Sequence, residues 1–262
     1  MHSASNRLAA SCELACLGLA LWSGAALTQN SGYEQLAELP DWTGTWLVDY
    51  SGPNTGFVTR PELTDAGMRQ VDEYQRMAAA GELPESGAAT ECVPNGMPAV
   101  MSLPLFLVEF YFTPSKIVAY TEAYGMVRWI YTDGRSVPEF AIPSYMGYSI
   151  GHWEGDTLVV STTNLYHGSQ LSIPDPNGQG TVPIQHSDEM RLEERIRLIG
   201  EDTLEIQTTI SDPVVFAKPG KTRYTFERHT GQEWEVSEFV CAQNNRAYLD
   251  EEGRLHQILT TD

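Results

Sequence analysis

A series of short strand-like runs separated by tight turns limits the fold of this chain more than any other feature. From about residue 105 onward, runs rich in β-branched and aromatic residues alternate with turns such as AYG, EGD, GED and TGQ. The runs cover residues 105–112, 116–122, 126–132, 146–153, 157–165, 189–199, 203–210, 222–229 and 233–241. About nine strands with such short connections predict an antiparallel meander that closes into a barrel, because closure removes exposed strand edges.

The part of the chain before these runs predicts one further strand and one helix. Residues 42–48 are typical of a first strand, and residues 65–80 have the apolar spacing of an amphipathic helix. Thr64 is placed to cap that helix, and Gly81 is placed to end it. We therefore expect a mainly β fold with one N-terminal helix.

Residues 1–26 have the composition of a secretory signal peptide. Arg7 supplies a positive charge, residues 14–27 are apolar but too short to span a bilayer, and residues 24–26 offer a small-residue cleavage site. An uncleaved membrane anchor is the alternative. We expect a periplasmic or secreted protein with a single β domain over residues 27–262, which does not insert into the membrane after cleavage.

Two cysteines lie outside the predicted signal peptide, Cys92 and Cys241. An even number of cysteines in an exported chain indicates a disulfide, which here would close a long loop. Two buried thiols are the alternative.

The net charge limits the partners of this chain. A formal charge of −19 repels phosphate backbones and anionic lipid head groups, so nucleic acid is excluded as a partner. No glycine-rich dinucleotide fingerprint and no P-loop occur in the sequence. We therefore expect no cofactor, and a small molecule as the ligand or substrate.

Four pieces of the sequence resemble a large family of uncharacterised secreted bacterial proteins. They are residues 91–98 (ECVPNGMP), 128–135 (RWIYTDGR), 147–160 (GYSIGHWEGDTLVV) and 186–188 (HSD), the last followed by Glu194 and Arg195. The resemblance spans nearly all of the mature chain and implies export and a single domain, but no activity. Relatives often carry His-Pro after the Asp-Gly-Arg element. This chain has Val137-Pro138 there, which puts any role of that histidine in doubt for this chain.

The start of the predicted domain resembles a second group of proteins. Gly44-Thr45-Trp46 is similar to the Gly-x-Trp opening of lipocalin-like barrels. The similarity implies that the expected barrel is lipocalin-like.

Residues 147–151 (GYSIG) match the G-x-S-x-G nucleophile elbow around Ser149. That elbow requires a strand, a sharp turn and then a helix whose first turn helps to bind the oxyanion. Here the five residues continue into His152 and Trp153, an acidic turn and another strand. We therefore interpret the match as a coincidence within a strand.

The alternation of residues 190–198 places one carboxylate on an apolar face. Met190, Leu192, Ile196 and Leu198 share that face with Glu194. A buried carboxylate must be paired or must act as an acid or base with a raised pKa. A structural pair with Arg128 or Arg228 is one interpretation, and a catalytic acid is the other.

Further polar residues are candidates for a site around Glu194. His186 is the candidate general base because an ordinary histidine pKa lies near neutrality, and Asp188 could orient it if both share the face of Glu194. A surface or capping role is the alternative for His186. Tyr131 is a further candidate catalytic residue. The candidates for binding substrate are Arg135, Arg128, His152 and Trp153. A structural clamp between Asp133 and Arg135 is the default interpretation for that turn.

Three histidines suggest a metal site, but their spacing does not favour one. His152, His167 and His186 lie 15 and 19 residues apart, by subtraction of their numbers, whereas metal-binding pairs are usually close in sequence. We therefore expect no bound metal, although three converging strands could still assemble a site.

Two classes of function remain for a barrel with such residues. The first is a cofactor-independent lyase, hydratase or isomerase, with His186 as base and Glu194 as buried acid. The second is a lipocalin-like binding or carrier protein for a small hydrophobic ligand. Titratable groups on the inward face favour the enzyme, whereas the lack of a known catalytic constellation favours the carrier. The sequence does not predict the oligomeric state.

Overall fold

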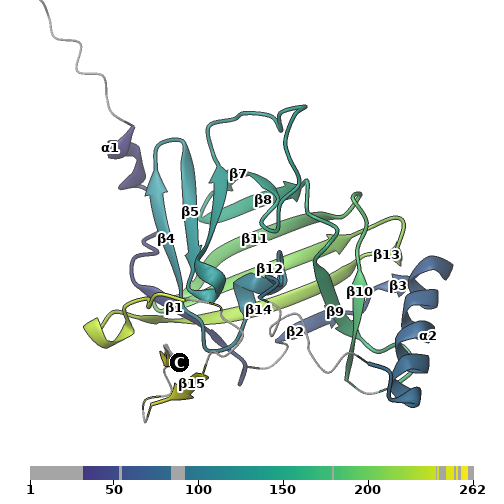
Figure 1. Ribbon diagram of the computed structural model, residues 1–262. Coiled ribbons are helices and arrows are strands. Elements are labelled where there is room, and N and C mark those ends of the chain that lie inside the picture. The colour runs from purple at the N-terminus through teal and green to yellow at the C-terminus, as the bar shows by residue number, and fades with distance from the viewer. Residues whose placement is uncertain are drawn as a thin grey trace, which may run out of the picture. The chain divides into compact units, whose positions relative to one another are not determined.

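The structure is a computed structural model that describes residues 32–52, 55–83, 92–178, 180–239, 241, 246–250, 252 and 255–258 (Figure 1). Residues 1–26, for which we predict a signal peptide, lie outside the described residues. No helix in the described part of the chain combines the length and the apolar character that a membrane span requires.

The described residues form sixteen short strands and two α-helices. The strands are β1 (Thr45–Asp49), β2 (Gly56–Thr59), β3 (Glu62–Leu63), β4 (Val108–Thr113), β5 (Lys116–Thr121), β6 (Met126–Tyr131), β7 (Tyr148–Glu154), β8 (Thr157–Thr163), β9 (Gln170–Pro174), β10 (Thr181–Gln185), β11 (Arg191–Gly200), β12 (Thr203–Ser211), β13 (Phe216–Lys218), β14 (Gly220–His229), β15 (Arg246–Leu249) and β16 (Leu255–Ile258). The helices are α1 (Tyr33–Leu36) and α2 (Asp65–Ala80). Only α2 is longer than one turn, so the fold is mainly β with one substantial helix, as the sequence predicts.

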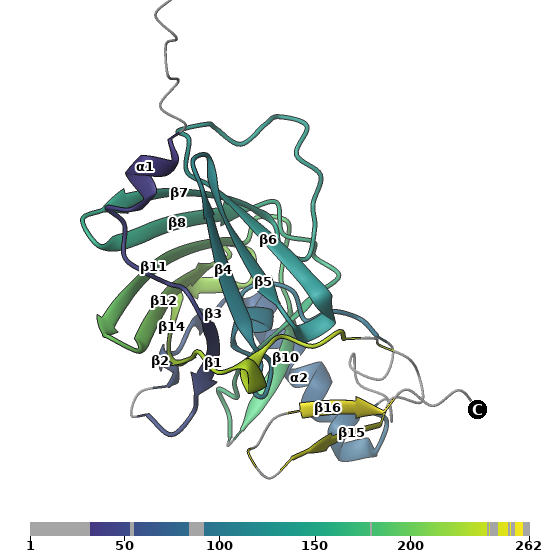
Figure 2. The same cartoon turned by 90° about the vertical axis from the view of Figure 1, so that its left-hand side faces the viewer.

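A closed barrel of 9 strands forms the centre of the fold. Neighbouring strands follow the order β1-β4-β5-β6-β7-β8-β11-β12-β14, and β14 pairs back to β1. Figures 1 and 2 show β7, β8, β11, β12 and β14 side by side, with β4, β5 and β6 crossing them steeply. Alternate residues point inward and are fully buried, among them Trp46, Ile117, Ile130, Leu158, Leu192, Ile196 and Phe226. The prediction of a closed barrel is confirmed.

One junction of the barrel departs from the predicted antiparallel meander. Strands β6 and β7 are parallel, and only two residue pairs join them, Ile130↔Ser149 and Tyr131↔Ile150. The chain leaves β6 through the long segment 132–147, and β7 begins beside the end of β6. Because the two strands overlap only at their ends, this junction has a short backbone ladder. We call it the β6–β7 seam.

A hairpin that the sequence analysis did not predict is inserted between β8 and β11. It consists of β9 and β10, whose register runs from Thr181↔Pro174 to Gln185↔Gln170. Helix α2 joins it through Gln70, whose side chain donates to the carbonyl of Gln185 at 3.0 Å and accepts from its amide at 2.8 Å. The insertion is therefore tied to the helix and forms a two-stranded sheet of its own.

Helix α2 has the two ends that the sequence predicts. The Thr64 hydroxyl accepts a hydrogen bond from the backbone N–H of Gly67 at 3.2 Å, which satisfies one of the free donors of the first turn. Gly81 follows the helix in the left-handed conformation (φ 69°), which glycine adopts without steric cost.

Cys92 and Cys241 form the predicted disulfide. The bridge joins residues separated by 149 positions, so it closes a loop that contains most of the barrel. Chain-entropy arguments give on the order of 4–5 kcal/mol for a loop of this length, as an upper value. A disulfide is typical of proteins that fold in an oxidising compartment.

The prediction of a strand over residues 233–241 is wrong for the described residues 233–239. A short 3-10 turn (Gln232–Trp234) opens this segment, and an irregular stretch follows. Side-chain contacts hold it instead of a ladder: Trp234 stacks on His229 at 3.7 Å, and the Ser237 amide donates to Glu122 Oε1 at 2.7 Å. Phe239 packs on Phe106 and Tyr124 with ring centroids 5.5 and 5.1 Å away, so ring contacts rather than strand pairing hold the aromatic residues of this segment.

Candidate functional site

Glu194 lies inside the barrel, as the alternation of its strand predicts, and its partner is Arg128. Both side chains are 1 % exposed. Arg128 Nη1 donates to Glu194 Oε1 at 3.1 Å, and Arg128 Nη2 donates to Glu194 Oε2. Arg228, the other partner considered from the sequence, instead donates to backbone carbonyls of Thr43 and Asp41. The two-pronged contact between the guanidinium and the carboxylate balances a charge that burial alone would strongly disfavour.

Two hydroxyl groups complete the surroundings of Arg128. Its Nε donates to Ser149 Oγ at 3.1 Å, and its Nη2 donates to Thr162 Oγ1 at 2.9 Å. The two hydroxyls lie 2.8 Å apart. Arg128, Ser149, Thr162 and Glu194 stand on four consecutive barrel strands, β6, β7, β8 and β11. The guanidinium therefore bridges the β6–β7 seam from inside the barrel and links it to the two strands beyond.

Ser149 is therefore a buried partner of Arg128 on β7. The segment around it does not form a nucleophile elbow, because β7 is followed by a tight turn and by β8 rather than by a helix. No local sequence pattern indicates the roles of Ser149 and Thr162, beyond their inward parity on adjacent strands. The register Ser149↔Thr162 places them opposite each other.

The outer side of the same seam carries two of the other candidates, Tyr131 and Arg135. Tyr131 of β6 and Tyr148 of β7 stack with their ring centroids 5.1 Å apart. The Arg135 guanidinium lies over the Tyr131 ring at 4.0 Å, and its Nε donates to Asp133 Oδ1 at 2.8 Å. Hydrogen bonds from Arg135 lower the pKa of Asp133 to about 2. The clamp between Asp133 and Arg135 is present, and Tyr131 and Arg135 reinforce the seam from outside.

His186 and Asp188 do not form the pair that the sequence analysis considered. His186 is buried, and its Nε2 lies 2.9 Å from Ser169 Oγ while its Nδ1 lies 2.9 Å from the Ser187 carbonyl oxygen. Asp188 is exposed and contacts His167 Nδ1 at 2.7 Å. Strand β11 begins only at Arg191, so the strand parity assumed for His186 and Asp188 does not extend to them. The proposed orientation of His186 by Asp188 is wrong.

The three histidines do not converge. His152 is exposed and lies 3.4 Å from Glu154, His167 faces Asp188, and His186 is bound to Ser169. Among the described residues, no group of three or more histidine, cysteine, aspartate or glutamate side chains could hold a metal ion.

Trp153 belongs to an aromatic cluster at one end of the barrel. Trp42 is its centre, with ring centroids of Phe110, Phe112 and Trp153 at 5.2, 5.4 and 5.5 Å. A pocket of about 220 Å³ opens beside the cluster, lined by Leu36, Leu39, Pro40, Asp41, Trp42, Thr43, Phe110 and Phe112. We call it the aromatic-end pocket. The inward parity of residues 108, 110 and 112 could have indicated the two phenylalanines, but nothing local links residues 36–43 to them.

The candidate residues therefore do not form one site. Arg128 and Glu194 lie inside the seam, and Tyr131 and Arg135 lie outside it. His186 lies near the β9–β10 hairpin and Trp153 in the aromatic cluster, while the exposed Asp188 and His152 contact His167 and Glu154. Glu194 and His186 share no hydrogen-bond partner among the described residues. The acid–base hypothesis thus stays a prediction, without a shared site to support it.

Comparisons with other proteins returned nothing to set beside this geometry: no protein family, no curated protein and no solved structure matches the chain.

Proposed function

We propose that this protein is a lipocalin-like binding or carrier protein of the periplasm or the extracellular space, which holds a small hydrophobic molecule in the aromatic-end pocket. The observation that carries the proposal is the lining of that pocket. Six of its eight lining residues are apolar or aromatic, and Asp41 and Thr43 are the two polar ones. Small-molecule sites are typically concave and apolar with a few polar groups.

The volume of the pocket limits the size of the ligand. Its 220 Å³ is below the roughly 300–1,000 Å³ of pockets for drug-sized molecules. An engineered apolar cavity of about 150 Å³ in another protein binds benzene. A single substituted aromatic ring, or a branched chain of similar size, therefore fits best.

The aromatic-end pocket also offers one unused hydrogen-bond donor nearby. The indole Nε1 of Trp42 is buried and has no hydrogen-bond partner among the described residues. Buried polar groups in native proteins almost always have a partner, so such a donor favours a ligand that carries an acceptor. A hydroxyl or carbonyl group on the ring would supply one.

The surroundings of Glu194 do not favour an acid–base role for it. Glu194, the candidate acid, already has both oxygens bonded to Arg128. A general acid must reach the substrate within hydrogen-bond distance, whereas this carboxylate is 1 % exposed. The carrier interpretation requires no titratable group inside the barrel.

We will test the proposal by titrating the protein with 4-fluorobenzyl alcohol, followed by fluorine NMR and by tryptophan fluorescence. We expect saturable binding that Leu36→Asp weakens at least about ten-fold, because an ionised side chain at the pocket opposes apolar contact. Ile199→Asp is the matched control, since Ile199 is exposed on β11 and does not line the pocket. Equal affinity of Leu36→Asp and the parent protein would disprove this site. Chemical conversion of a bound probe would favour the enzyme instead.

A further inference from the structure

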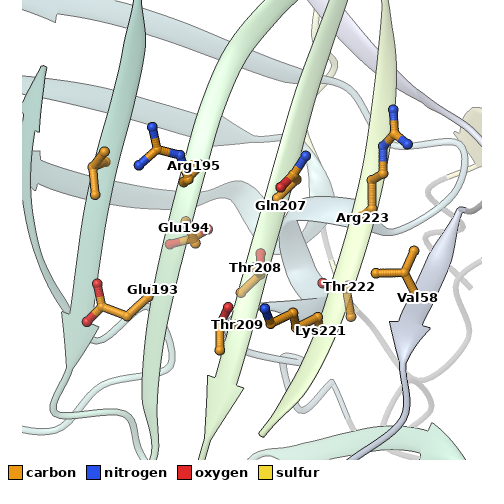
Figure 3. Close-up of a pocket in the computed structure, with 11 residues that line it drawn as sticks. Val58, Glu193, Glu194, Arg195, Gln207, Thr208, Thr209, Lys221, Thr222 and Arg223 are labelled. Atoms are coloured by element: carbon orange, nitrogen blue, oxygen red, sulfur yellow. The ribbon is translucent and has the colours of Figure 1, made fainter. Parts of the chain in front are cut away.

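A second concave surface lies on the outside of the barrel, away from the aromatic-end pocket. It has a volume of about 580 Å³ and shares no lining residue with that pocket. Figure 3 shows its side chains on neighbouring strands, with Val58 of β2 at one side. Six of the lining residues are charged or polar and point outward from the barrel: Glu193, Arg195, Gln207, Thr209, Lys221 and Arg223. We call this surface the outer groove.

The strand register arranges these six residues in two rows across β11, β12 and β14. One row is Arg195↔Gln207↔Arg223, and the next is Glu193↔Thr209↔Lys221. Neighbouring strands lie about 4.8 Å apart, so each row spans roughly 10 Å at the backbone. Each row therefore places a neutral polar side chain between two charged ones, at the scale of a small polar molecule.

Lys221 is the cation of the groove that is free to bind a ligand. It forms no ion pair with any described residue, although it stands in a chain of net charge −19. Its side chain extends toward Thr209 on the neighbouring strand (Figure 3). An ammonium group with no carboxylate partner, beside a hydroxyl group, is an anchor for an incoming anion.

The two arginines of the groove are held in place but keep free donors. Arg223 Nε lies 2.6 Å from Glu205 Oε2, and Glu205 is 1 % exposed. Arg195 Nη1 donates to Glu154 Oε2 at 2.9 Å. The terminal nitrogens of Arg223 form no hydrogen bond with the described residues. Each guanidinium is thus oriented by one contact, which lowers the entropy that it would lose on binding a ligand.

We propose that the outer groove binds a small hydroxylated carboxylate, such as a sugar acid. Its carboxylate would contact Lys221 and Arg223, and its hydroxyl groups would contact Gln207, Thr209 and Glu193. Glu193 accepts from Ser161 Oγ at 2.7 Å, so its second oxygen can accept from a hydroxyl group of the ligand. This ligand matches both the cations and the hydrogen-bonding groups of the two rows.

The overall acidity of the chain does not prevent this binding, but it limits the kind of anion. At physiological ionic strength, charges farther than about 8 Å are largely screened, so the local cations decide the potential felt by a small molecule. A long polyanion would extend beyond the groove over a chain whose net charge is −19. We therefore infer a small anion rather than a polymer.

We will test the groove by calorimetry with glucuronate and glucose in a low-salt buffer without phosphate. We expect glucuronate to bind at least about ten-fold more tightly than glucose, because only glucuronate carries the carboxylate. Lys221→Gln should remove that preference, and 0.3 M NaCl should weaken glucuronate binding. Arg191→Gln removes the same charge from the same outer face but outside the groove, so it is the matched control.

Three outcomes would overturn the proposal: glucuronate does not bind, glucose binds equally well, or Arg191→Gln lowers the affinity as much as Lys221→Gln does. Because the aromatic-end pocket shares none of these residues, a failure here leaves the carrier proposal untouched, and the 4-fluorobenzyl alcohol titration can be run on the same variants.

Discussion

The strands at the β6–β7 seam are held together differently from those of the adjoining wall. We use the word wall for β8, β11, β12 and β14. In the wall, the β11–β12 ladder runs from Arg191↔Ser211 to Gly200↔Thr203. At the seam, two residue pairs are all that join the strands. Backbone hydrogen bonds therefore hold the wall along its length, while the seam depends on side chains.

Those side chains act on both faces of the seam. Inside, Arg128 connects β6 to Ser149 on β7 and to Glu194 on β11. Outside, Tyr131 stacks on Tyr148. Four of the candidate site residues, Arg128, Glu194, Tyr131 and Arg135, thus brace a junction of only two residue pairs, a ladder as short as that between β1 and β4. An inward charge on a strand can therefore indicate a structural cross-link as well as a catalytic group.

The largest effect is expected when the seam loses its internal cross-link. Arg128→Met leaves the Glu194 carboxylate buried without its cation, and breaking such a pair usually costs about 3–5 kcal/mol. Urea denaturation measures the free energy of unfolding, and amide hydrogen exchange should show the protection of β6 and β7 falling more than that of β11 and β12.

A double variant separates the cost of the unpaired charge from the loss of the cross-link. Arg128→Met combined with Glu194→Leu removes both charges, and such apolar replacements often restore most of the stability. The Ser149 and Thr162 hydroxyls can still bond to each other across their 2.8 Å separation. If Arg128→Met alone leaves stability unchanged, the ion pair does not hold the seam.

A smaller effect is expected in the wall, where Glu205 is equally buried but faces outward. Its partners Arg197 and Arg223 are 49 % and 36 % exposed, so they can turn to water once Glu205 is changed. We expect Glu205→Gln to cost about 1–2 kcal/mol, and less at 0.5 M NaCl. The same urea experiment measures it. If Glu205→Gln lowered the free energy of unfolding as much as Arg128→Met does, the seam would not depend on side chains more than the wall does.

Local patterns were sufficient to predict several features of this molecule. Strand alternation placed Glu194 inside and left Arg128 among its possible partners. The cap at Thr64, the end at Gly81 and the bridge between Cys92 and Cys241 follow from side-chain chemistry that acts over a few residues or from the number of cysteines. All of these except the bridge rest on information that the sequence carries near the residue itself.

Features that depend on distant contacts could not be predicted in this way. The short parallel pairing of β6 and β7 depends on the path of residues 132–147, which no local pattern indicates. The pairing of His186 with Ser169, and not with Asp188, follows from where β11 begins. The aromatic-end pocket joins residues 36–43 to β4 only in the folded chain.

The smallest effect is expected on the exposed outer side of the seam, at the clamp between Asp133 and Arg135. Hydrogen bonds from Arg135 hold the pKa of Asp133 at about 2, below its ordinary 3.8. A carboxyl group whose pKa is lower in the folded than in the unfolded protein stabilises the fold at pH values above its unfolded pKa. This contribution disappears as the pH falls from about 4 toward 2.

Arg135→Gln should return the pKa of Asp133 toward 3.8, without a measurable shift of the urea midpoint at pH 7, because water screens the pair. Carbon-detected NMR of the side-chain carboxyl follows the titration: at pH 3 the group should be mainly ionised in the parent protein and mainly protonated in the variant. An unchanged titration would show that the clamp is not maintained in solution, whereas a lower urea midpoint would give the outer side of the seam a larger share in holding β6 to β7 than we assign to it.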